Sequence, residues 1–239
     1  MSEDVIIEMM SARLIVWRCL HGGPLTAQSL DQWPTGDGVP WADFRARNLP
    51  LLSTLTEAYG ACAVVARGGD AVVGHLRFYP KAVCTFAAGG AAMCLQQKAP
   101  YGPPDNAGGA GFPPMEQLPD KTLFVHCLML ARAEQGRPSY RRRGIATRMA
   151  RALIQWATEK GWRAVEATAY EDLDTVYATT GAAGKSFWQK LAFRITEQGT
   201  EAAFEDYPEL LGAMVEEGRA RGLSPEDVKR KYTMRLDLP

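Results

Sequence analysis

The segment from residue 121 to residue 170 constrains the fold more than any other part of the chain. It begins with KTLFVHCLMLA (121–131), a run with few polar residues that predicts a strand buried within a sheet. A strongly amphipathic helix is predicted over 145–160, and Gly161 ends it. The run WRAVEATAY (162–170) predicts a second strand. Two strands joined by one helix form a crossover connection, so we expect the sheet to contain a parallel pair.

The other strands are predicted from alternating runs that are rich in β-branched residues. Two of these runs flank Gly68-Gly69-Asp70 and predict an antiparallel hairpin over 61–67 and 71–80. Further strands are expected at 12–19, 193–198 and 231–238, and further helices at 47–58, 182–192 and 206–220. The fold class that follows is α/β, with a mixed α+β sheet.

Residues 81–119 differ in composition from the rest of the chain. They contain six glycines and six prolines and leave room for one short strand or helix near 82–97. A segment of this kind inside a compact domain is usually a functional lid or is disordered. We therefore expect one domain over 1–239, with its core at about 12–80 and 121–198, an insertion at 81–119, and C-terminal helices and a last strand at 199–239.

Charge and cysteine content exclude several classes of function. The chain has 27 basic and 27 acidic residues, and bulk binding of nucleic acid or anionic membranes normally requires a basic excess. No apolar run reaches the roughly 18 residues of a membrane helix, and the N-terminus does not resemble a secretory signal. The five cysteines and three histidines lack the spacings of metal sites, so no metal is predicted. Cys127 is expected to act as a small buried hydrophobe and His126 as a structural residue. A cytoplasmic protein with reduced thiols is expected.

Positive charge is concentrated where the helix at 145–160 begins. Arg141, Arg142 and Arg143 precede Gly144, whose lack of a side chain lets the backbone approach a ligand. A helix N-terminus carries N–H groups without intrahelical partners and about half a positive charge, so it binds phosphate well. The motifs G-x-x-x-x-G-K-S/T and G-x-G-x-x-G are absent, which excludes a Walker loop and a dinucleotide fingerprint. A solvated cluster of helix-capping arginines is the alternative.

In this setting the residues Arg141-Arg142-Arg143-Gly144-Ile145-Ala146 resemble a known motif. They match the Q/R-x-x-G-x-G/A pyrophosphate loop of the GNAT superfamily of acyl-CoA-dependent N-acyltransferases. Further along, SFWQKLAF (186–193) is similar to the short helix and K-L-G-F of that family. The resemblance covers about 60–198 well, the first strand loosely, and 81–119 not at all. It implies a GNAT-like fold with 81–119 inserted between strands 3 and 4, where the insertion would border the acceptor site.

The resemblance also implies a co-substrate, acetyl-CoA, and the backbone that would hold it. The pyrophosphate would lie on the N–H groups of 142–147, and the pantetheine arm would add to the strand at 128–130. The implied binding residues are Leu128, Met129, Leu130, Arg141, Arg142, Arg143, Gly144, Ile145, Ala146 and Thr147. The acceptor amine would attack directly, and a backbone N–H at or near Leu130 would stabilise the oxyanion.

Two side chains are candidates for moving protons. An alkylamine with a pKa near 10.4 is protonated at pH 7, so a base is needed. Thr168 stands where the family often has a glutamate, and Glu166, two residues earlier on the same face, is the candidate base. The alternative for Glu166 is an ion pair or a polar pocket. Trp188 stands at the position of the family's usual tyrosine acid, so Tyr177 on the adjacent loop is the candidate acid, while Gly181 lies near the place of the family's asparagine.

The resemblance therefore implies an N-acetyltransferase with an unidentified acceptor. A small amine, an amino acid and a protein N-terminus all remain open, as do the acyl chain length and the oligomeric state, a homodimer included. A second hypothesis is a sensor or regulatory module of the same fold that binds acyl-CoA without transferring the acyl group. A third is a protein-interaction module that docks through 81–119 or 206–230 and binds no acyl-CoA.

Overall fold

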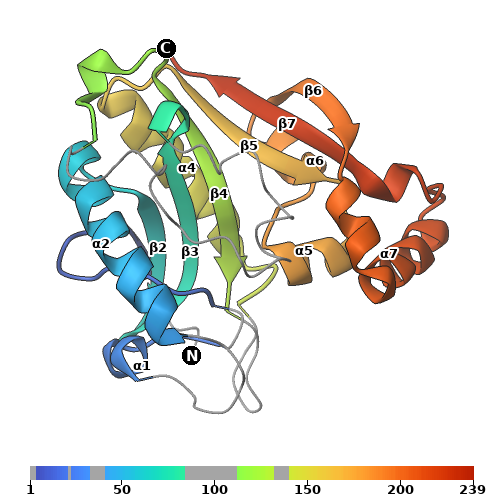
Figure 1. The fold of residues 1–239 in the computed structure, drawn as a ribbon, viewed down its shortest axis with the longest axis horizontal. Coiled ribbons are helices and arrows are strands. Elements are labelled where there is room, and N and C mark those ends of the chain that lie inside the picture. The colour runs from blue at the N-terminus through green and yellow to red at the C-terminus, as the bar shows by residue number, and fades with distance from the viewer. Residues whose placement is uncertain (1–3, 21–22, 33–40, 84–111, 132–139) are drawn as a thin grey trace.

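The computed structural model describes residues 4–20, 23–32, 41–83, 112–131 and 140–239. Seven strands form one sheet in the order β1-β2-β3-β4-β5-β7-β6 (Figure 1). Their bounds are β1 Val5–Met9, β2 Ala63–Gly68, β3 Ala71–Pro80, β4 Thr122–Leu130, β5 Ala164–Tyr170, β6 Arg194–Thr200 and β7 Arg230–Asp237. The helices are α1 Ala27–Asp31, α2 Trp41–Tyr59, α4 Ile145–Glu159, α5 Asp174–Thr180, α6 Lys185–Gln189 and α7 Pro208–Ala220.

The predicted crossover is confirmed. β4 pairs with β5 in parallel, whereas the other pairs of described strands are antiparallel, including the predicted β2–β3 hairpin. The helix predicted over 145–160 is α4, and Gly161 follows it with a φ of +77°. A mixed α/β sheet is therefore present, as the alternation of apolar runs predicts.

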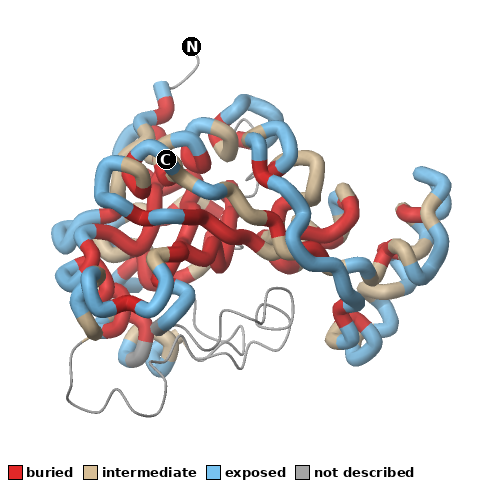
Figure 2. Tube along the Cα trace, turned by 90° about the horizontal axis from the view of Figure 1, so that it is seen from above, coloured by how far each residue is buried: buried red, intermediate tan, exposed pale blue. Residues whose placement is uncertain are grey.

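Two helices cover opposite faces of the sheet (Figure 1). Successive side chains of β3 point to opposite faces of the sheet, so every second residue shares a face. Phe78 packs on Trp156 of α4, and a Cβ added to Gly74 would lie 3.2 Å from Met149 of the same helix. α2 lies over the other face of the sheet, and His75 and Arg77, two residues apart on β3, point toward that face. Figure 2 shows buried residues concentrated through the middle of the sheet.

The strand predicted at 12–19 is absent, and this prediction is wrong. The first strand is β1, which pairs with β2, and 12–19 follow it without regular structure. Side chains bind the carbonyl groups that a neighbouring strand would otherwise bind. Arg77 donates to the carbonyls of Val16 and Arg18, and the Asn48 amide donates to the carbonyl of Trp17. The apolar alternation therefore reflects burial of this segment against the sheet and not strand pairing.

The C-terminal part differs from the prediction in its helices. α5 is not predicted, and the helix expected at 182–192 is the shorter α6. The last strand is confirmed as β7, and its neighbour β6 is exposed along its length. A second apolar cluster joins the end of β5 to α5 and α7 and contains Tyr170, Leu173, Val176, Phe204, Met214 and Val228. Most of the predicted insertion, residues 84–111, lies outside the described residues. Within the described ranges, no helix combines the length and apolar character that a membrane span requires.

Candidate active site

The turn that leads into α4 exposes its backbone. Gly144 is the N-cap of α4 and has a φ of +72°, and Arg142, two residues earlier, has a φ of +60°. A Cβ added to Gly144 would meet no described atom within 4 Å, so this backbone faces open space. Backbone N–H groups in alternating conformations of this kind form concavities that bind anions.

The first N–H groups of α4 are available to a ligand. The first intrahelical bond runs from the Arg148 N–H to the Gly144 carbonyl, at 3.0 Å. The N–H groups of Ile145, Ala146 and Thr147 precede that bond and have no intrahelical acceptor. Among the described residues no side chain caps this end, and the first turn carries no acidic residue. These donors and the helix dipole fit a pyrophosphate.

Aromatic rings position two of the arginines beside this turn. The guanidinium of Arg141 lies 5.0 Å from the centre of the Tyr177 ring and 3.5 Å from the Asp174 carboxylate. The guanidinium of Arg143 lies 5.8 Å from the ring of Tyr140. Both arginines remain exposed, so their charge can add to the field at the start of α4. Arg141 also links the turn to α5.

The edge of β4 beyond the parallel ladder is covered by another segment of the chain. The β4–β5 ladder ends at Val125, although both strands continue. Beyond that point the N–H of Leu128 donates to the carbonyl of Gly181 at 3.0 Å, and the N–H of Leu130 donates to the hydroxyl of Tyr177 at 3.2 Å. The two N–H groups predicted to face a pantetheine arm therefore already have acceptors within the chain.

Tyr177, the candidate acid, lies beside the candidate oxyanion donor. Its hydroxyl oxygen accepts the hydrogen bond from the N–H of Leu130, which leaves the hydroxyl proton for donation. Burial raises the pKa of Tyr177 above its usual value of 10, so this hydroxyl stays protonated at neutral pH. The structure thus brings together two predicted functional groups from β4 and α5.

Glu166, the candidate base, lies elsewhere on the sheet. Both of its carboxylate oxygens are held by cations, one by Lys81 at 2.6 Å and the other by Arg235 at 2.7 Å. Its neighbour across the parallel ladder is Phe124, six positions before Leu130, which corresponds to about 20 Å along a strand. The structure does not bring Glu166 and Leu130 together, and it gives Glu166 the ion-paired surroundings of the alternative interpretation.

Trp188, at the family's usual tyrosine position, is a core residue. It is 1% exposed and packs against the rings of Phe187 and Phe193. An indole does not titrate as an acid in the working range of an enzyme, so Trp188 contributes packing here. Tyr177, the candidate acid, was expected on a loop beside this position, but it lies in the preceding helix, α5.

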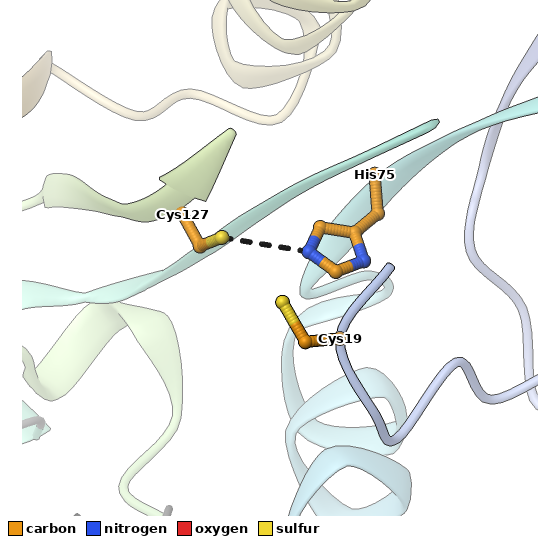
Figure 3. A group of neighbouring side chains, drawn as sticks. All are labelled: Cys19, His75 and Cys127. Atoms are coloured by element: carbon orange, nitrogen blue, oxygen red, sulfur yellow. Dashed lines mark hydrogen bonds between the residues drawn. The ribbon is translucent and has the colours of Figure 1, made fainter. Parts of the chain in front are cut away.

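Sequence reasoning missed a group of side chains beside Tyr177. The Sγ of Cys127 lies 3.5 Å from the Nε2 of His75, and Cys19 completes a group whose donor atoms lie within 4.8 Å of one another (Figure 3). Cys127 is buried, as predicted, but it is not surrounded by apolar side chains alone. Spacing rules could not detect this group because its members come from three distant segments. Gly181 was singled out in the sequence, but its packing was not predicted: an added Cβ would lie 3.0 Å from the Cys127 sulfur.

The sequence and the structure were compared with known proteins. The profile of the acetyltransferase (GNAT) family matches residues 27–178. No curated protein sequence matches significantly. Solved structures of similar fold include an acetyltransferase of the GNAT family from Streptococcus pneumoniae, which is 11% identical, covers 99% of this chain and 100% of its own, and has a TM-score of 0.48. A GNAT family acetyltransferase from Elizabethkingia anophelis with acetyl-CoA bound is 14% identical, with coverages of 99% and 100% and a TM-score of 0.42. The IAA acetyltransferase from Bacillus cereus is 13% identical, with coverages of 98% and 100% and a TM-score of 0.44.

Proposed function

Since the chain belongs to the acetyltransferase (GNAT) family and is an N-acetyltransferase of that type, we propose that it transfers an acetyl group from acetyl-CoA directly to an amine in a ternary complex. One observation carries the proposal. The first N–H groups of α4 have no described side-chain cap, face open space at Gly144 and lie beside exposed arginines. Such a turn suits the pyrophosphate of a coenzyme A thioester.

The chain's own residues would bind and orient the co-substrate. The N–H groups of Ile145, Ala146 and Thr147 would donate to the pyrophosphate, and the arginines at 141–143 would supply the opposing charge. The bound group supplies an activated acetyl thioester, which is the chemistry that no side chain of the chain provides. We propose no metal and no covalent intermediate for this transfer.

The edge of β4 must open before a pantetheine arm can pair with it. The acceptors that now hold the N–H groups of Leu128 and Leu130 are the Gly181 carbonyl and the Tyr177 hydroxyl. We propose that residues 177–181 release these N–H groups when acyl-CoA binds. The pantetheine arm would then supply the acceptors, because each buried N–H must keep one. Covering the edge in the meantime satisfies both donors and excludes water.

Two of the groups at this edge have catalytic roles in the proposal. The N–H of Leu130 would donate to the developing oxyanion, an interaction that is stronger in the transition state than in the ground state. The buried Tyr177 hydroxyl would protonate the departing thiolate. A thiol with a pKa near 8.5 is already a fair leaving group, so this acid contributes less than the oxyanion donor. Glu166 lies about 20 Å along the sheet from Leu130, farther than one bridging water spans, so the proposal gives it an ion-pairing role and not that of the base.

The test is amine-dependent release of the coenzyme A thiol. The wild type would be incubated with acetyl-CoA and a panel of small alkylamines, amino acids and peptides with an α-amino group. We expect thiol release with at least one acceptor class, and no acetylated protein when the amine is omitted, as assessed by intact mass. An acetyl group on Cys127 in the absence of amine would contradict direct attack.

A second outcome distinguishes the sensor hypothesis. Trp188 in place of an acid and the covered edge of β4 are the observations that favour it. Tight binding of acetyl-CoA with no thiol release across the panel would support a binding module and would contradict the transferase proposal.

A further inference from the structure

Three potential metal ligands meet beside the proposed acyl-transfer site (Figure 3). Cys19 lies in the segment between β1 and α1, His75 lies on β3, and Cys127 lies on β4. One donor atom from each lies within 4.8 Å of the other two. His75 and Cys127 are buried, whereas Cys19 is half-buried, so the group is reachable from the Cys19 side.

The separations are close to those of a filled tetrahedral site. With Zn–S and Zn–N bonds of about 2.3 and 2.05 Å and tetrahedral angles, sulfur and nitrogen ligands lie about 3.6 Å apart and two sulfurs about 3.8 Å apart. The Cys127 sulfur and His75 Nε2 are already 3.5 Å apart. Cys19 would need to approach by at most about 1 Å, which a rotation of its half-buried side chain can supply.

A fourth sulfur lies at the same place. Met129 is two residues after Cys127 on β4, on the same face, and is directly opposite His75 across the ladder. Its Sδ lies 3.3 Å from the Sγ of Cys19. Two thiols, one imidazole and one thioether form a soft donor set, which suits Zn²⁺ or Cu⁺ and not Mg²⁺ or Ca²⁺.

Arg77 holds the ligand segments in place. It follows His75 by two residues on β3, is fully buried, and donates to the carbonyl of Arg18 at 2.7 Å, immediately before Cys19. This bond ties the Cys19 segment to the strand that carries His75. Arg77 also lies opposite Cys127 in the β3–β4 register.

We propose that Cys19, His75 and Cys127 form a binding site for one thiophilic cation, with the Met129 thioether as a fourth donor for Cu⁺. Two thiolates and one imidazole are a known type of zinc ligand set that leaves a fourth position open. Thioethers are ligands for Cu⁺ rather than for Zn²⁺, so Met129 separates the two metals. The site does not depend on acetyl transfer, although it lies beside Gly181, which covers β4.

The test is a titration of the reduced, metal-free protein with Co²⁺ under anaerobic conditions. Co²⁺ is a spectroscopic substitute for Zn²⁺, and bound thiolates give it a charge-transfer absorption. We expect this signal to saturate at one equivalent and to disappear when Zn²⁺ is added. Cys127→Ser and Cys19→Ser should each abolish it, whereas Cys62→Ser, which changes a buried thiol outside the group, should retain it.

A second arm separates the two cations. Competition with a chromophoric chelator would measure the affinity for Zn²⁺ and for Cu⁺ in the wild type and in Met129→Leu. We expect the substitution to weaken Cu⁺ binding at least tenfold and to leave Zn²⁺ binding unchanged. Equal Cu⁺ affinities would remove Met129 from the ligand set.

Folding controls keep the result decisive. Cys19 is half-buried, so Cys19→Ala should retain the fold, and its thermal unfolding would be compared with that of the wild type with and without Zn²⁺. Zn²⁺ should raise the Tm of the wild type and leave the Tm of Cys19→Ala unchanged. A folded wild type that shows no cobalt signal and takes neither Zn²⁺ nor Cu⁺ from the chromophoric chelator would overturn the proposal. So would a signal that persists in both serine variants, because the metal would then lie elsewhere.

Discussion

The start of α4 and the edge of β4 belong to one proposed site, yet they are built in opposite ways. The start of α4 consists of contiguous residues, 140–147, and offers backbone N–H groups that have no intrahelical acceptor. The edge of β4 is buried, and the acceptors for its N–H groups come from about 50 residues further along the chain. A contiguous backbone motif can be recognised in a sequence, whereas a buried edge is defined only when distant segments meet.

Two glycines show the same difference on the scale of one atom. Gly144 and Gly181 have φ values of +72° and +67°, so the backbone makes the same demand at both. A Cβ at Gly144 would meet nothing within 4 Å, but a Cβ at Gly181 would lie 2.9 Å from Met129 and 3.0 Å from Cys127. The buried edge should therefore respond to pH and to added methyl groups more strongly than the exposed turn.

Acid should destabilise the protein through β4. Burial, followed by the charge of Arg77, lowers the pKa of His126 from 6.5 to about 3. Because the pKa of His126 is lower in the folded state than in the unfolded state, protonation favours the unfolded state. The free energy of unfolding is therefore fully present above about pH 6.5 and falls as the pH drops toward 3. The whole shift corresponds to at most about 5 kcal/mol. Urea unfolding between pH 7 and pH 5 should show a steeper loss for the wild type than for His126→Gln, and equal slopes would contradict this account.

A methyl group should separate the two glycines. Gly144→Ala should cost about 1 kcal/mol, which is the strain of a left-handed conformation in a residue with a Cβ. Gly181→Ala carries the same strain and also overpacks against Met129, so we expect about 3 kcal/mol in total. Denaturant unfolding measures both free energies. Equal losses would show that the segment at Gly181 is not packed on β4.

Removing the charge of Glu166 should affect stability more than catalysis. Glu166→Gln breaks ion pairs with Lys81 and Arg235, and their partial exposure limits the loss to about 2 kcal/mol. If these pairs are its role, kcat should fall by less than about tenfold. A fall of roughly 10² to 10⁴ would instead identify Glu166 as the base. Lys81→Met is the matched control, since it disturbs the same pair without removing the carboxylate.

The smallest loss of stability is expected for Tyr177→Phe. The N–H of Leu130 would lose its acceptor, at a cost of about 1 kcal/mol. The kcat should fall about tenfold, while the affinity for acetyl-CoA should change little. Because burial raises the pKa of Tyr177, the wild type should show no loss of this acid below pH 10. An unchanged kcat in the variant would assign Tyr177 a structural role.

The fold could be predicted where local pattern and tertiary contact agree. The helix at 145–160 has an apolar stripe that packs on the sheet, and the hairpin around Gly69 has its turn chemistry in the sequence. The alternation at 12–19 led to a wrong strand because burial alone can produce it, and here side chains bind the carbonyl groups. α5 was missed because it is short and packs mainly on α7, an element far along the chain.

The candidate site divides in the same way. The anion-binding turn follows from contiguous residues, including Gly144, whereas the contact between Leu128 and Gly181 needs the fold. Tyr177 was predicted from its place beside the family's usual acid, and in the structure its hydroxyl accepts a hydrogen bond from the N–H of Leu130. The group formed by Cys19, His75 and Cys127 has no local signal, because segments up to about a hundred residues apart supply it.

Calorimetric titration of acetyl-CoA into the wild type, Gly144→Glu and Gly144→Gln tests the anion-binding turn most directly. The two variants share the backbone strain and side-chain length and differ by one negative charge. We predict that the wild type binds, that Gly144→Gln binds about tenfold more weakly, and that Gly144→Glu loses about 100-fold or more, or about 2.7 kcal/mol. A folded wild type that does not bind, or a Gly144→Glu variant that binds equally well, would contradict the account.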